Sequence, residues 1–186
     1  NSCCSHPLSS DSESDLIDAS GVKRAAIRKL HQELGISPDE LSLEDFHFVT
    51  KMMYSARMNA DWIEREIDHI LVIQADVNIK INQNEVSEIK WVSKQELHQI
   101  LAGDIDIGGE IAPWFRCIAE RVMTDEWWDS VGNLDRIVEL RDDLIHDMGD
   151  VSDMLSTATG AGLNTSIMEV KPLVERRISD SLCASK

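Results

Sequence analysis

Residues 64–79 form a segment rich in isoleucine, valine and leucine, and this segment constrains the fold more than any other part of the sequence. Such a run is typical of a strand buried in a sheet, and it is too short to cross a bilayer. Residues 46–57 alternate in part between apolar and polar side chains and predict a second strand. Residues 86–92 predict a third strand, anchored by Val86 and Trp91. The sequence therefore predicts a sheet in the core.

Helical patterns flank these strands. Apolar residues recur every four positions over residues 21–34, and Gly35 ends this predicted helix. Ser93 and Glu96 form a capping box that starts a short helix running to Leu101. Two further helices are predicted, over residues 111–128 and 133–148.

We therefore expect the α/β (α+β) class, with a mixed sheet flanked by helices and a helical C-terminal part. A chain of 186 residues is long enough for one domain with a substantial core. From Gly149 onward the residues are small and polar, which is typical of a linker. The expected division is a main domain over 1–130, a C-terminal helix over 131–148 and a flexible tail or linker over 149–186.

The charge balance limits the partners. Lys and Arg total 18 and Asp and Glu total 34, so the formal net charge is −16. Such an acidic surface repels phosphate, which argues against nucleic acid and anionic membranes and favours a small-molecule partner. The four cysteines are not spaced like a secreted disulfide framework, so we expect free thiols in the cytoplasm, with a plastid or peroxisome as alternatives.

Two pairs of polar residues carry potential chemistry. Cys4 and His6 are two residues apart before Pro7, which favours an extended segment with both side chains on one side. A thiol beside an imidazole suits proton transfer or metal binding, and a buried thiol beside a solvated histidine is the structural alternative. Glu64 and Glu66 likewise share one strand face, where they suit Mg²⁺ or Mn²⁺ or simply form a solvated side of the sheet.

Aromatic residues and one helix add further candidates. Tyr54 is the only tyrosine and lies on a predicted strand. Trp114 opens a predicted helix, and its indole could stabilise a cation or simply pack in the core. On the helix over 21–34, Lys29 and Glu33 have the spacing of a simple ion pair.

The motifs occur in an order that resembles one family. The ordered set is Asn1–Pro7, Glu33–Gly35, Trp62–Asp68 and Pro113–Phe115. It is similar to type I isopentenyl-diphosphate delta-isomerase, of the Nudix superfamily, over roughly residues 1–134. This resemblance implies a Nudix-like main domain and an isomerase of isoprenoid biosynthesis. Such an enzyme interconverts isopentenyl and dimethylallyl diphosphate by adding a proton to a double bond and removing another.

The resemblance also implies roles for individual residues. Cys4 and Glu66 would be the acid/base pair on opposite faces of the substrate, Tyr54 would hydrogen-bond near Glu66, and Trp114 would cover the cationic intermediate. The implied metal ligands and substrate contacts fall into three sets. These are His6, Glu64 and Glu66 for a first divalent metal (Mn²⁺, Mg²⁺ or Zn²⁺), Glu33 for a Mg²⁺ that bridges the diphosphate, and Ser5 and Arg28 for the diphosphate itself.

Two departures from the family pattern keep alternatives open. Lys29 and Gln32 stand where a Nudix hydrolase has glutamates, so a Nudix-type diphosphate hydrolase is the less supported enzymatic alternative. The chain begins at Asn1 and lacks the family's first half, which supplies further metal histidines and basic residues. We therefore expect a fragment with a partial metal site and weak or no activity by itself, or a non-catalytic truncated interaction product.

Overall fold

The computed structural model of the chain describes three stretches, residues 2–57, 59–155 and 167–170. Its larger sheet has the strand order β2-β1-β4, with β1 at Phe46–Arg57, β2 at Ile63–Ile73 and β4 at Ile145–Asp150. Strand β1 is antiparallel to β2 and parallel to β4, so the sheet is mixed, as expected. A smaller parallel sheet pairs β3 (Ile89–Val92) with β5 (Ile167–Val170).

The β1–β2 hairpin confirms the strand predicted over 46–57 and shortens the one predicted over 64–79, which ends at Ile73. Burial alternates along β1, so one face of this strand lies in the core. The register places Tyr54 opposite Glu66 and Ala56 opposite Glu64. This pairing fixes which side chains of β2 share a face with the buried side chains of β1.

Helix α1 (Ser20–Leu34) confirms the helix predicted over 21–34. It ends at Gly35, whose φ of +65° suits glycine and whose N–H bonds the His31 carbonyl. A Cβ on Gly35 would lie 2.2 Å from the Lys80 carbonyl oxygen, so the close approach of the chain also requires glycine. Helix α2 (Lys94–Ala102) begins with the predicted capping box, in which the Ser93 N–H donates to Glu96 and the Glu96 N–H donates to Ser93.

The single helix predicted over 111–128 is wrong. The structure divides it into α3 (Pro113–Cys117), a π-helical turn η4 (Ile118–Val122) and α4 (Asp125–Ser130). Met123 leaves helical geometry, and the Thr124 side chain accepts a hydrogen bond from the Trp127 N–H to start α4. Met123 and Trp127, on the two sides of this break, belong to the same buried cluster.

The helix predicted over 133–148 is also wrong. Helix α5 spans only Leu134–Glu139, and the residues after it form β4 beside β1. Asp142 anchors the chain beside β1 just before β4. Its N–H donates to the Val49 carbonyl, and its carboxylate accepts from Thr50 and from the Leu144 N–H. Pairing with an existing strand thus overrides the helical pattern, and the C-terminal part is not purely helical.

The tail expected from residue 149 onward is in part structured. Val151 is buried, and Met154 packs on the same cluster at the start of the segment. Residues 167–170 form β5, whereas residues 156–166 and 171–186, with Cys183, lie outside the described residues. Four short 3₁₀ turns complete the described chain, at Ile17–Ala19, Pro38–Glu40, Leu43–Asp45 and Ser152–Leu155.

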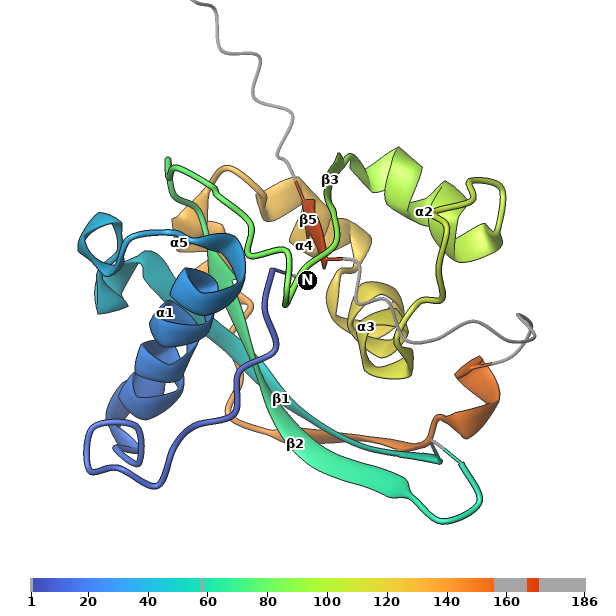
Figure 1. Cartoon of the computed structure of the whole chain (residues 1–186), viewed down its shortest axis with the longest axis horizontal. Coiled ribbons are helices and arrows are strands. Elements are labelled where there is room, and N and C mark those ends of the chain that lie inside the picture. The colour runs from blue at the N-terminus through green and yellow to red at the C-terminus, as the bar shows by residue number, and fades with distance from the viewer. Residues whose placement is uncertain (1, 58, 156–166, 171–186) are drawn as a thin grey trace, which may run out of the picture.

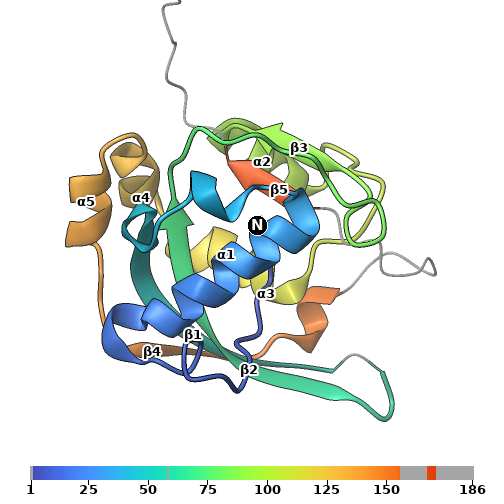
Figure 2. The ribbon, with the colours of Figure 1, turned by 60° about the vertical axis from the view of Figure 1, so that its left-hand side comes forward.

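The arrangement in space brings the N-terminal segment to the middle of the molecule. Figure 1 shows the β1–β2 hairpin between α1 and the helices α2 and α3. Both Figure 1 and Figure 2 place the N-terminal segment between α1 and α3. No helix in the described stretches is both long and apolar enough to span a membrane.

Candidate active site

A cavity of about 1550 Å³ lies where the N-terminal segment, β2 and α3 meet. Five residues expected to act in the site line it: Cys4, Ser5, His6, Glu66 and Trp114. They come from parts of the chain more than 100 residues apart in sequence, so the fold itself assembles this group. Tyr54, Glu64, Glu33 and Arg28 are not among the lining residues.

Three carboxylates share the inner face of β2. Glu64, Glu66 and Asp68 alternate along the strand and are partly buried, and they face the same side as the buried Met52, Tyr54 and Ala56 of β1. Burial, and then the charges of Glu66 and Glu64, raise the pKa of Asp68 to about 6. The inner face of β2 therefore holds concentrated negative charge beside the cavity.

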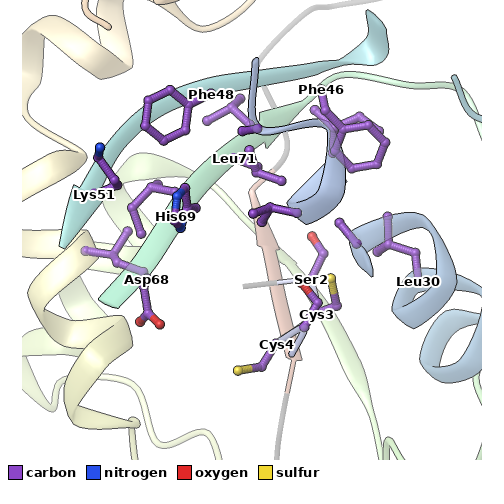
Figure 3. Close-up of a pocket in the computed structure, with 18 of the residues that line it drawn as sticks. Ser2, Cys3, Cys4, Leu30, Phe46, Phe48, Lys51, Asp68, His69 and Leu71 are labelled. Atoms are coloured by element: carbon purple, nitrogen blue, oxygen red, sulfur yellow. The ribbon is translucent and has the colours of Figure 1, made fainter. Parts of the chain in front are cut away.

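The two adjacent thiols are directed differently. Figure 3 shows the Cys4 sulfur on the side of Asp68 and the Cys3 sulfur on the side of Leu30 in α1. Cys3 packs against the apolar cluster under α1, whereas Cys4 is exposed. Desolvation, and then the charges of Asp68 and Glu66, raise the pKa of Cys4 to about 11. The Cys4 thiol is therefore protonated at neutral pH.

His6 lies at the edge of this charged group. Its Nε2 is 3.7 Å from Oε1 of Glu66, and the imidazole is largely exposed. Cys4 and His6 both line the cavity with Glu66, as does every residue from Ser2 to Ser9, so the expected placement of the two side chains on one side of the segment stays a prediction.

Tyr54 supports the site from the adjacent strand. Its ring is buried, and its hydroxyl donates a short hydrogen bond to Glu64. Burial raises the pKa of Tyr54 well above its usual value, and the bond to Glu64 raises it further, so the phenol stays protonated. Tyr54 also lies directly opposite Glu66 in the register.

The expected three-ligand metal site is not assembled. In the stretches that the structure describes, no group of three or more His, Cys, Asp or Glu side chains is positioned to hold a metal ion. His6 lies beside Glu66, but Glu64 accepts its hydrogen bond from Tyr54. The oxygen and imidazole donors are the types that Mg²⁺ or Mn²⁺ accepts, yet these residues complete only a pair of ligands.

Glu33 and Arg28, both on α1, already have partners. Oε1 of Glu33 lies 2.8 Å from Nζ of Lys29, which is the simple i, i+4 ion pair that the spacing allowed. The Arg28 guanidinium bonds the Glu13 carboxylate and the His6 carbonyl. The geometry therefore does not direct Arg28 toward a diphosphate in the cavity.

Trp114 is placed between the cavity and the core. It lines the cavity and is partly buried against two apolar clusters. Its ring lies edge to face with that of Phe115, with 6.1 Å between the two ring centroids. Trp114 therefore both packs against the core and borders the cavity, and its contact with a cation stays a prediction.

Two residues of the site were missed by sequence reasoning. Asp68 continues the i, i+2 spacing of Glu64 and Glu66, so alternation along the strand could have identified it. Glu13 binds Arg28 across 15 residues of sequence, and no local pattern signals that contact.

The chain thus has an α/β fold, with a mixed sheet between helices and acidic residues beside a large cavity. The NUDIX domain model matches residues 18–115, just over half of the chain, and the chain belongs to the Nudix family.

Curated relatives narrow the similarity. Isopentenyl-diphosphate Delta-isomerase 1 of Mesocricetus auratus is 38% identical over 139 residues, which cover 75% of this chain and 61% of that protein. Isopentenyl-diphosphate delta-isomerase idi1 of Aspergillus fumigatus is 43% identical over 146 residues, covering 73% and 51%. The chloroplastic isopentenyl-diphosphate Delta-isomerase II of Arabidopsis thaliana is 38% identical over 145 residues, covering 76% and 51%. The resemblance inferred from the motifs is confirmed, and the chain spans between half and about three fifths of the length of these relatives.

Proposed function

We propose that the protein containing this chain interconverts isopentenyl and dimethylallyl diphosphate. The names of the similar proteins support this substrate class. The observation that carries the proposal is that the Cys4 thiol and the Glu66 carboxylate reach one cavity from two separate elements, the N-terminal segment and β2. A 1,3-proton shift needs two such groups at one substrate.

The proposed chemistry moves two protons and no other atoms. One group adds a proton to the terminal alkene carbon, which leaves a tertiary carbocation. The other group removes a proton from the carbon on the far side of the cation, and that electron pair becomes the new double bond. Cys4 and Glu66 are the proposed pair, and the protonated state of the Cys4 thiol at neutral pH suits a donor.

The surroundings suit a short-lived cation. Trp114 offers an indole face at the cavity, which stabilises positive charge without supplying a nucleophile. Tyr54 holds Glu64 by a hydrogen bond and lies opposite Glu66, so it restrains the acidic strand face. Ser5, which lines the cavity, is the proposed contact of this chain to the diphosphate.

Divalent cations remain part of the proposal. His6 and Glu66 are the pair that a first metal ion would use, and Glu33 is the candidate for a Mg²⁺ that bridges the diphosphate. A bound cation would offset the carboxylate charge and hold phosphate oxygens. Because the described residues complete no three-ligand group, the remaining ligands would come from the substrate or from chain beyond those residues.

The proposed partner is a small-molecule diphosphate, and the proposed compartment is the cytoplasm. Cys3, Cys4 and Cys117 are free thiols, which agrees with a reducing environment.

A matched pair of cysteine variants tests the function. In the protein containing this chain, Cys4→Ala should lower isomerisation by about 10³-fold, whereas Cys3→Ala, on the other side of the segment, should change it less than about tenfold. Product formation with Mg²⁺ or Mn²⁺ is followed by NMR in D₂O, with free phosphate measured in parallel. Phosphate release without isomerisation would assign a hydrolase instead, and equal effects of the two variants would remove Cys4 from the mechanism.

A further inference from the structure

We propose that the Glu13–Arg28 pair is a positioning device that keeps the Cys4 sulfur directed toward β2 while the Cys3 sulfur packs under α1, although both cysteines line the cavity. The pair acts on the N-terminal segment, defined here as residues 2–16; Glu13 lines the cavity and Arg28 does not. The inference rests on the proposed function only in treating Cys4 as a site residue.

The N-terminal segment cannot position its own side chains. It contains no helix or strand, and its backbone hydrogen bonds are those of turns over residues 8–14 and one from the Gly21 N–H to the Asp15 carbonyl oxygen. Its remaining course therefore depends on contacts with neighbouring elements, although it carries Cys4 and His6. Adjacent side chains of an extended segment point to opposite sides, so a shift by one residue would exchange Cys3 and Cys4.

Arg28 supplies the contacts nearest to these thiols. Its Nε donates to Oε1 of Glu13 at 2.8 Å, and its Nη2 donates to Oε2 of Glu13 at 2.9 Å. The same Nη2 donates to the His6 carbonyl oxygen at 2.9 Å. One guanidinium on α1 thus fixes the backbone two residues after Cys4, with the planar fork that lysine lacks.

Glu13 is the partner that holds Arg28 in this orientation. Its side chain is only 9% exposed, and Oε2 also accepts the Leu8 N–H at 2.8 Å. The hydrogen bond from Arg28 and then that from Leu8 lower the pKa of Glu13 to about 2, so the carboxylate stays charged across the physiological range. Glu13 therefore links both Arg28 and the backbone of the segment.

A second, independent observation shows that this segment is pressed against α1. A Cβ added to Gly21 would lie 2.3 Å from the Glu13 carbonyl oxygen and 2.7 Å from that of Asp15. Arg24 donates to the Ser12 carbonyl oxygen at 2.9 Å, one turn of helix before Arg28. The end of the segment is thus fixed by close packing against α1. The Glu13–Arg28 pair fixes the part of the segment nearer to Cys4.

The test compares thiol reactivity in Glu13→Gln and Arg28→Lys with the wild-type chain. Alkylation of Cys3 and of Cys4 by iodoacetamide is quantified separately by tandem mass spectrometry. Because Cys3 packs under α1 with a pKa of about 12, its alkylation should rise about tenfold when the pair is lost. The control is Glu120→Gln, which removes the carboxylate from another arginine ion pair, Arg116–Glu120 at 3.1 Å.

Amide hydrogen exchange separates positioning from general stability. In both variants exchange should quicken more in residues 2–13 than in β1 and β2, whose exchange rises only with the loss of global stability. A Cys3 rate no higher than in the control would overturn the proposal, and so would exchange that quickens equally throughout the described chain, which would make the pair a general stabiliser. No substrate turns over in these measurements, so a failure of the isomerase assay leaves this result standing.

Discussion

Carboxylates play opposite parts in two regions of the molecule, the contact of α1 with the N-terminal segment and the inner face of β2. At α1, Glu13 pairs with Arg28 at 2.8 Å. On β2, Glu64, Glu66 and Asp68 lie together, and within the described stretches none of them forms an ion pair with a lysine or arginine. His6, mostly exposed, is the cationic candidate nearest to them.

The difference separates acids that hold the fold from acids that are available for chemistry. A carboxylate that accepts charged hydrogen bonds gains stability in the folded state, as the lowered pKa of Glu13 shows. A partly buried carboxylate beside others costs stability, as the raised pKa of Asp68 shows. This loss of stability arises beside the cavity, where binding a proton or a cation would reduce the repulsion between the carboxylates.

The largest expected effect is that two variants with the same chemical change act in opposite ways: one loses mainly activity and the other loses mainly stability. Glu66→Gln should lower isomerisation by about 10³-fold and leave the free energy of unfolding within about 0.5 kcal/mol of wild type. Glu13→Gln should lower isomerisation by only about tenfold, through misplacement of the thiol, and cost about 2 kcal/mol of stability. Turnover and urea denaturation of each variant provide the measurements.

Glu120→Gln serves as the neutral reference, because its ion pair with Arg116 lies on a partly exposed helix surface away from both regions. If Glu66→Gln destabilised the chain as much as Glu13→Gln, or if the two lowered turnover equally, the division between the two kinds of carboxylate would be wrong.

Much of the fold could be predicted because its signals are local. The strand over 46–57 and the Ser93 capping box follow from alternation and from two side chains three residues apart. The ordered motifs likewise indicated the residues that meet at the cavity, Cys4, His6, Glu66 and Trp114. Their meeting itself depends on the tertiary fold, and the resemblance supplied what periodicity could not.

The errors arose where distant partners decide the outcome. The segment after Glu139 abandons its helical pattern because β1 offers a strand to pair with and Asp142 bonds its backbone. Arg28 has the charge to bind a diphosphate, but a carboxylate 15 residues away engages it instead. Asp68 was visible in the sequence, yet its importance comes from burial, which composition does not reveal.

A smaller effect is expected from adding a divalent cation. At 10 mM Mn²⁺, a site with a Kd of about 1 mM would stabilise the chain by about 1.4 kcal/mol, or roughly 4 °C in Tm. Binding at the β2 face requires Glu66, so Glu66→Gln should abolish the shift, whereas Glu13→Gln should retain it. Differential scanning fluorimetry measures both. If the Tm shift on adding Mn²⁺ were unchanged in Glu66→Gln, the cation would bind elsewhere. Metal binding would then not distinguish the unpaired carboxylates of β2 from the paired Glu13.

The smallest effect is a stability profile with opposite slopes, one from each region. Asp68 has a folded pKa of about 6 against an ordinary 3.8, so the folded state takes up its proton first and stability rises as the pH falls from about 7 to 4. Glu13 has a folded pKa of about 2 against an ordinary 4.5, so its contribution is complete above pH 4.5 and is lost as the pH falls toward 2.

The two slopes meet in a maximum near pH 4, which urea denaturation at steps from pH 3 to 8 would locate. Asp68→Asn should flatten the profile above the maximum, by about 1 kcal/mol between pH 4 and 7, because an amide has no proton to gain. Glu13→Gln should flatten it below the maximum for the same reason. If Asp68→Asn kept the slope above the maximum, the β2 carboxylates would be neutralised by a partner outside the described residues. The carboxylates of β2 and of α1 would then both be paired, and the two regions would differ only in how strongly.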